Sequence, residues 1–98
     1  MSDRARWSDL RRHRMAEPGA EAAYESARLA YELGRAVREL REGRGWSQSR
    51  LAQAAGMTQS AIARLEGGGT VPTLTVLTRI ANALDAELAV RLTPRTAA

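Results

Sequence analysis

The chain has 98 residues, which suits one domain with an additional arm or tail. It contains no cysteine and one histidine, His13, so disulfides and thiolate metal sites are excluded and we expect neither a metal centre nor a cofactor. The formal net charge is +4 at pH 7, and this moderate excess is compatible with nucleic-acid binding or with an ordinary solvated surface. No apolar run reaches the length of a membrane span and no signal peptide is visible, so we expect a cytoplasmic protein with no membrane partner.

The first predicted element is a short helix over residues 2–15, which a break at Glu17-Pro18-Gly19 separates from the rest. A helix this short is marginal in water and needs a surface to pack against. An apolar face on an arginine-rich helix is typical of a segment that docks on a partner protein. The candidate contact residues are Trp7, Leu10, Arg11 and Met15. Two alternatives are open for this arm, residues 1–19: its arginines contact DNA phosphates, or Trp7 folds back onto the next helix.

A long helix is predicted over residues 20–42, because large apolar side chains recur along one face. That face consists of Leu29, Leu33, Val37 and Leu40. Gly34 lies within the helix and costs about 1 kcal/mol relative to alanine, which indicates either a bend or a close approach by another helix. Gly43 and Gly45 then end the helix.

Residues 47–65 predict two short helices joined by a tight turn. Ser47 and Thr58 are good N-caps, because their side-chain oxygens can accept a hydrogen bond from a free backbone N–H. Gly56 lies where the first helix must end, since glycine tolerates a left-handed backbone. The apolar positions at helical spacing are Leu51, Ala52, Ala55, Ile62 and Leu65. This pattern is typical of a helix-turn-helix, whose second helix enters the major groove of DNA.

A last helix is predicted after the turn at residues 67–70, with Pro72 and Thr73 at its start and an apolar face over 74–84. Residues 87–93 then alternate between apolar and polar, which predicts a strand. Its apolar positions are Leu88, Val90 and Leu92. No other strand is predicted, so we expect it to pair with the same strand of a second copy; a frayed helical tail is the alternative. We assign residues 20–93 to one domain and expect 94–98 to be a disordered tail.

Residues 33–88 resemble the XRE (Cro/phage-repressor) helix-turn-helix family. The matching positions are Arg41, Ser47, Gln48, Leu51, Ala52, Gly56, Ile62, Leu65, Glu66, Pro72, Leu74, Leu77, Ala81 and Leu84. One departure is the run of three glycines at 67–69, where the family often has one glycine followed by polar or basic residues. The resemblance implies an all-α, lambda-repressor-like fold of five helices. The first helix is the N-terminal arm, and a short dimerisation strand ends the fold.

The flanks narrow the resemblance to antitoxins of the HigA type. A tryptophan-containing N-terminal segment, the long helix and the strand-like end carry this similarity. It implies a homodimer that represses its own operon by binding operator DNA and that neutralises a RelE/HigB-like ribonuclease toxin through the arm. The alternatives are an XRE-family regulator without a toxin and an adaptor that has lost DNA affinity. We expect no enzyme, because no nucleophile–base pair, metal cluster or phosphate loop is visible.

Base contacts in this motif come from the leading end of the second helix. The candidates are Thr58, Gln59, Ser60 and Arg64. Gln59 can form a bidentate pair with adenine, and Arg64 with guanine. An ordinary solvated helix face is the alternative for Gln59 and Ser60. Gln48, at the start of the preceding helix, matches a family position that contacts phosphate or base.

Phosphate contacts are expected where helix N-termini point outward. Ser47 and Thr73 lie at two such starts, and Arg50 adds either a charge contact or only solubility. In this fold the end of the long helix packs beside the end of the second helix of the motif. We therefore expect Arg41 and Glu66 to form a partly buried, bidentate salt bridge with a structural role.

Overall fold

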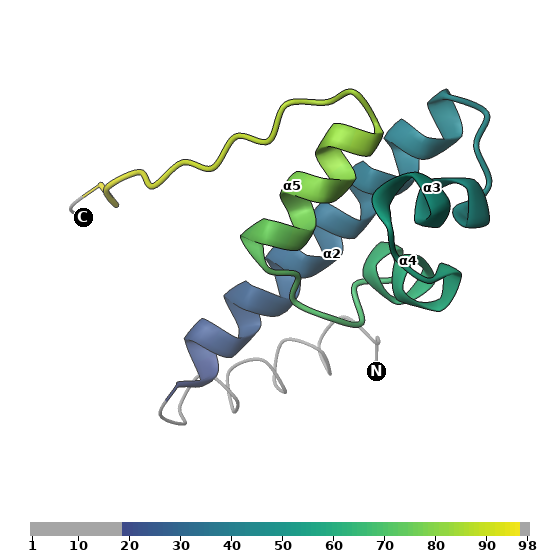
Figure 1. Ribbon diagram of the computed structural model, residues 1–98. Coiled ribbons are helices and arrows are strands. Elements are labelled where there is room, and N and C mark those ends of the chain that lie inside the picture. Colours follow the sequence, from purple (N-terminus) through teal and green to yellow (C-terminus); the bar gives the residue numbers. More distant parts are fainter. Residues whose placement is uncertain (1–18, 97–98) are drawn as a thin grey trace, which may run out of the picture.

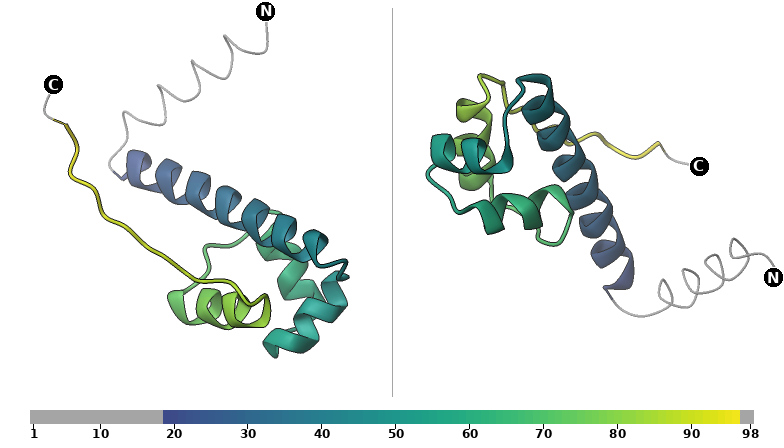
Figure 2. Two further views of the ribbon diagram at one scale, coloured as in Figure 1. Left: turned by 90° about the horizontal axis from the view of Figure 1, so that it is seen from above. Right: turned by 90° about the vertical axis from the view of Figure 1, so that its right-hand side faces the viewer.

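The computed structural model describes residues 19–96, which fold into four α-helices (Figure 1). They are α2 (Ala20–Gly43), α3 (Gln48–Ala55), α4 (Gln59–Glu66) and α5 (Leu74–Ala83). The three short helices lie on one side of the long α2 (Figure 2). Helix α3 contacts both α4 and α5, and α4 contacts α2. In residues 19–96 no helix combines the length and the apolarity that crossing a bilayer requires.

The four helices account for all but one of the helices expected from the sequence. The remaining one, over residues 2–15, lies outside the described residues. So do its candidate partner contacts, Trp7, Leu10, Arg11 and Met15. What the structure describes is therefore the all-helical body that follows the arm.

The short helices begin at capping side chains that the sequence predicts. The hydroxyl oxygens of Ser47, Thr58 and Thr73 each accept a hydrogen bond from the backbone N–H three residues on, at 3.0–3.1 Å. Helix α3 ends at Gly56, whose φ of 66° is left-handed. At this φ the Cβ of an L-residue would lie too close to the following carbonyl oxygen, so glycine suits the tight turn into α4.

The core lies where α3, α4 and α5 meet α2. Its largest fully buried side chains are Leu51, Ile62, Leu65 and Ile80. Val37, Ala52, Ala55 and Leu84 complete the buried cluster. The small side chains on α3 let this helix pack closely against its neighbours, which places α3 and α4 rigidly against each other.

The face of α2 that packs on the core differs from the predicted one. Only Val37 of the predicted stripe is buried, and Leu29 and Leu40 are 48% and 46% exposed. The buried positions of α2 are Ala30, Gly34, Val37 and Arg41. A Cβ on Gly34 would lie 2.3 Å from the carbonyl oxygen of Leu65, so the helices meet too closely for a large side chain at this point. Of the two interpretations of Gly34, the close approach is the one that holds.

The strand predicted over residues 87–93 is not formed in the part of the chain that the structure describes. After α5 the backbone is neither helix nor strand, and it returns toward the start of α2 (Figure 2). There Nη1 of Arg95 lies 3.9 Å from Oε1 of Glu21. A strand needs a hydrogen-bonded neighbour, and residues 19–96 contain no second extended segment paired with it. Of its apolar side chains, Leu88 is partly buried, whereas Val90 and Leu92 are exposed.

Candidate nucleic-acid interface

The outer side of α4 presents polar side chains to solvent, from its N-cap Thr58 to Arg64 in its last turn. Thr58, Gln59, Ser60 and Arg64 are all exposed. On the opposite side of the same eight-residue helix, Ile62 and Leu65 are buried in the core. Because the inner side is fixed by packing, the outer side is held at a constant position on the surface of the domain. A rigid helix end with polar groups facing outward has the shape and chemistry to enter a major groove.

A buried ion pair ties the end of α2 to the end of α4. Arg41 donates from Nε to Oε2 of Glu66 at 2.7 Å and from Nη2 to Oε1 at 2.9 Å. Its third donor, Nη1, binds the backbone oxygen of Trp46 at 2.7 Å. The hydrogen bond with Glu66 is the main reason that the pKa of Arg41 is raised above its usual value. The structure thus brings together the two residues that the sequence analysis paired.

The ion pair extends to the surface through two glutamines. Nε2 of Gln48 donates to Oε1 of Glu66 at 3.2 Å, and Nε2 of Gln59 donates to Oε1 of Gln48 at 2.8 Å. We call these four residues, Arg41, Glu66, Gln48 and Gln59, the polar network. The sequence analysis assigned Gln48 and Gln59 separate contacts and missed the bond between them. The signal available was their position, one residue after the N-cap of two consecutive crossing helices.

The other predicted phosphate contacts lie at the starts of α3 and α5. Ser47 and Thr73 are exposed N-caps; each uses an oxygen lone pair on its own helix, which leaves the hydroxyl proton to donate to a phosphate oxygen. The guanidinium of Arg50 stacks over the ring of Trp46, 4.9 Å from its centroid. Arg44, which the sequence analysis did not consider, lies 4.7 Å from the same centroid.

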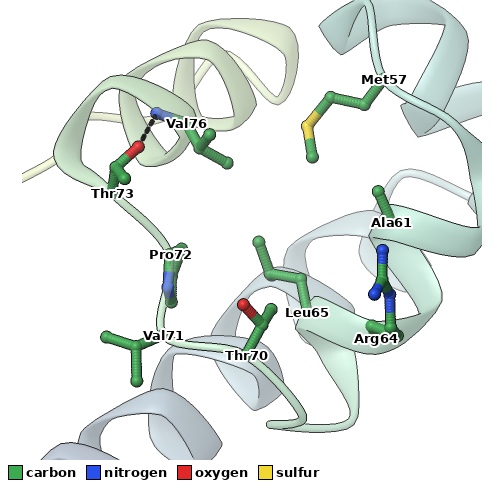
Figure 3. Close-up of a pocket in the computed structure, with 9 residues that line it drawn as sticks. All are labelled: Met57, Ala61, Arg64, Leu65, Thr70, Val71, Pro72, Thr73 and Val76. Carbon is green, nitrogen blue, oxygen red and sulfur yellow. Dashed lines mark hydrogen bonds between the residues drawn. The ribbon is translucent and has the colours of Figure 1, made fainter.

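A shallow pocket separates α4 from the start of α5 (Figure 3). Its volume is about 250 Å³, and Arg64 and Thr73 are among the residues that line it. The remaining lining residues are Met57, Ala61, Leu65, Thr70, Val71, Pro72 and Val76. Small-molecule sites usually occupy 300–1,000 Å³ and enclose their ligand, so this hollow is better regarded as a gap between α4 and the start of α5.

Comparison with known proteins agrees with this geometry. Residues 32–93 match the family described as helix-turn-helix domain. The chain is 35% identical over 66 residues to the HTH-type transcriptional regulator SutR of Escherichia coli (strain K12), a match that covers 67% of this chain and 37% of that protein. The solved structure of the restriction-modification controller protein C.AhdI from Aeromonas hydrophila is similar. Its TM-score is 0.58 and its identity 34%, over 59% of this chain and 88% of that one.

The likeness concerns the helical domain, because the chain spans little more than a third of the length of SutR. The family match, in contrast, covers well over half of the present chain, from the middle of α2 to beyond α5. It includes both helices of the motif and every residue of the polar network. This chain therefore belongs to the helix-turn-helix domain family, of the XRE type.

Proposed function

We propose that this protein is a sequence-specific DNA-binding transcriptional regulator that recognises its operator through the leading end of α4. The observation that carries the proposal is the exposure of Thr58, Gln59, Ser60 and Arg64 on a helix whose other side is buried. The family match and the likeness to two proteins named as a regulator and a controller support it.

In this proposal the contacts divide into base and phosphate groups. Gln59 pairs with adenine and Arg64 with guanine, because these side chains match the donors and acceptors of those bases in the major groove. The helix starts at Ser47 and Thr73 bind phosphates, since hydroxyl and backbone N–H groups there can donate to anionic oxygens. Arg50 adds a positive charge from a position stacked on Trp46.

The regulator acts as a homodimer in this proposal. The exposed apolar side chains Val90 and Leu92 are costly to leave in water, and a second copy would cover them together with Leu88. Two recognition helices about 34–36 Å apart would then fit one turn of a palindromic operator. Sedimentation of the Leu92→Arg variant tests the assignment: it should be a monomer if this segment forms the interface.

The test of DNA recognition is selection from a library of randomised DNA duplexes, followed by binding measurements at several salt concentrations. We expect one sequence to be enriched and its affinity to fall as salt rises, because phosphate contacts release counterions. Gln59→Ala should lose preference at one position of the site, whereas Gln53→Ala, on an exposed part of α3, should not. Failure to enrich any sequence would refute the proposal.

A finer proposal is that the regulator is also an antitoxin that neutralises a RelE/HigB-like ribonuclease. The supporting observation in the described residues is the partly exposed apolar stripe of α2, formed by Leu29, Leu33 and Leu40. Co-purification with the product of the neighbouring gene, by the full chain and by a chain lacking residues 1–15, tests this proposal. If the neighbouring gene does not encode a small ribonuclease, a regulator without a toxin becomes the better interpretation.

A further inference from the structure

The polar network has a fixed direction, because one of its ends can only accept hydrogen bonds. The carboxylate of Glu66 forms an ion pair with Arg41 and accepts hydrogen bonds from two of its N–H groups, at 2.7 and 2.9 Å. An ionised carboxylate has no proton to donate. Any group that bonds to it must therefore be a donor, and Gln48 meets this requirement with Nε2.

The requirement for a donor at Glu66 fixes the orientation of the Gln48 amide, and the Gln48 amide in turn fixes that of Gln59. Since the amide of Gln48 is planar and its NH₂ group points to Glu66, its Oε1 is turned toward Gln59. That oxygen can only accept, so Gln59 must present its own Nε2 to it. A flipped amide at Gln59 would place two oxygens against each other. The orientation of Gln59 thus follows from the charge of a residue in the interior.

The orientation decides which groups of Gln59 are left for a ligand. One N–H is occupied by Gln48, so one N–H and Oε1 remain free at the exposed end. Adenine presents one acceptor, N7, and one donor, the N6 amino group, in the major groove, which this pair of groups matches. Guanine presents two acceptors, N7 and O6, so Oε1 of Gln59 would face an acceptor.

We propose that Glu66 is a positioning residue for base recognition: acting through Gln48, it fixes the orientation of the Gln59 amide and so makes Gln59 select adenine over guanine. The proposal rests on the proposed function of α4 as the recognition helix. It assigns the buried ion pair a second role besides holding α2 to α4. The gain in binding free energy comes from preorganisation, because the side chain of Gln59 is already ordered before DNA binds.

Two variants interrupt the network at different points. Gln48→Met removes the amide link with little change in side-chain length and leaves the pair of Arg41 and Glu66 intact. Glu66→Gln keeps the shape of the side chain but replaces the carboxylate with an amide that can turn either end toward Gln48. Gln53→Met is the matched control, the same substitution at an exposed position of α3.

The measured quantity is the ratio of affinities for two duplexes. One is the sequence enriched from the randomised library, and the other carries guanine for adenine at the position whose preference Gln59→Ala abolishes. We expect a ratio of about 5 to 150 in the parent and in Gln53→Met, the range for one good bidentate pair. In Gln48→Met and Glu66→Gln we expect the ratio to fall to within about threefold of unity.

The ratio separates positioning from stability, because partial unfolding lowers both affinities by the same factor. An unchanged ratio in both variants would overturn the inference, and so would a guanine at the position that Gln59 contacts. Loss of the ratio in Gln48→Met alone would show that Glu66 plays no part, and loss in Glu66→Gln alone would exclude the route through Gln48. Each of these results leaves the proposed function standing; a library with no enriched sequence overturns both.

Discussion

Replacing Gly34 by alanine tests the close contact on which the packing of α2 depends. A Cβ at this position would lie 2.3 Å from the carbonyl oxygen of Leu65 and 2.8 Å from that of Glu66. Both atoms belong to the backbone of α4, so they cannot move aside by a change of rotamer. To accept the methyl group, α2 and α4 must separate, and the core between them must loosen.

The expected cost follows from two opposing terms. Alanine is the better helix former by about 1 kcal/mol, which favours the variant. Overpacking a well-packed interior costs about 1–3 kcal/mol, and a clash with backbone belongs at the upper end of that range. We therefore expect Gly34→Ala to lower the free energy of unfolding by about 2 kcal/mol. At about 4–8 °C per kcal/mol for a domain of this size, the melting temperature should fall by about 8–16 °C.

The assay is thermal and urea unfolding followed by circular dichroism, with Gly43→Ala as the matched control. Gly43 is the last residue of the same helix, and a Cβ there would meet nothing within 4 Å. The control should melt at or above the temperature of the parent, since only the propensity term applies. The reasoning is refuted if Gly34→Ala is as stable as the control.

Variants at three further positions test other features of the structure. Glu66→Ala leaves Arg41 buried without its partner, so we expect a loss of about 3–5 kcal/mol in urea unfolding; a parent-like melting curve would contradict the ion pair. Gly56→Ala should cost about 1–2 kcal/mol at a φ of 66°, and Gly56→Asn less, because asparagine tolerates this backbone. The third position is Glu42, whose pKa is lowered because Arg38 donates a hydrogen bond to it. Its contribution to stability is present above the ordinary pKa and is lost as pH falls through the lowered one. Glu42→Gln should therefore flatten the fall of the melting temperature below about pH 4.3.

The helix-turn-helix could be predicted from sequence because its signals are local. Each of the residues Ser47, Thr58 and Thr73 caps a helix by accepting a hydrogen bond from the backbone N–H three residues further on, and Gly56 marks the turn. The apolar residues at helical spacing, beginning at Leu51, then identify the buried faces of the two helices. Each of these inferences needs only the geometry of one helix, so tertiary context has little opportunity to overturn it.

The inferences that failed depend on what lies opposite an element. The leucines of α2 are regularly spaced, yet Leu29 and Leu40 are half-exposed because Gly34 brings α2 against the backbone of α4. The alternation at Leu88, Val90 and Leu92 is consistent with a strand, but a strand exists only with a neighbour. The bond between Gln48 and Gln59 depends on the crossing of two helices, which no periodicity within either helix encodes.

The buried ion pair is difficult to explain by stability alone. Removing Arg41 and Glu66 from water costs free energy that their attraction only partly returns, and an apolar pair of similar volume often stabilises a fold as well or better. An apolar pair, however, could not accept a hydrogen bond from Gln48. Only a group that accepts and never donates can hold the two glutamines in a single orientation. In our proposal the charge in the interior therefore also serves base recognition, through the hydrogen bonds that connect Arg41 and Glu66 to the exposed amide of Gln59.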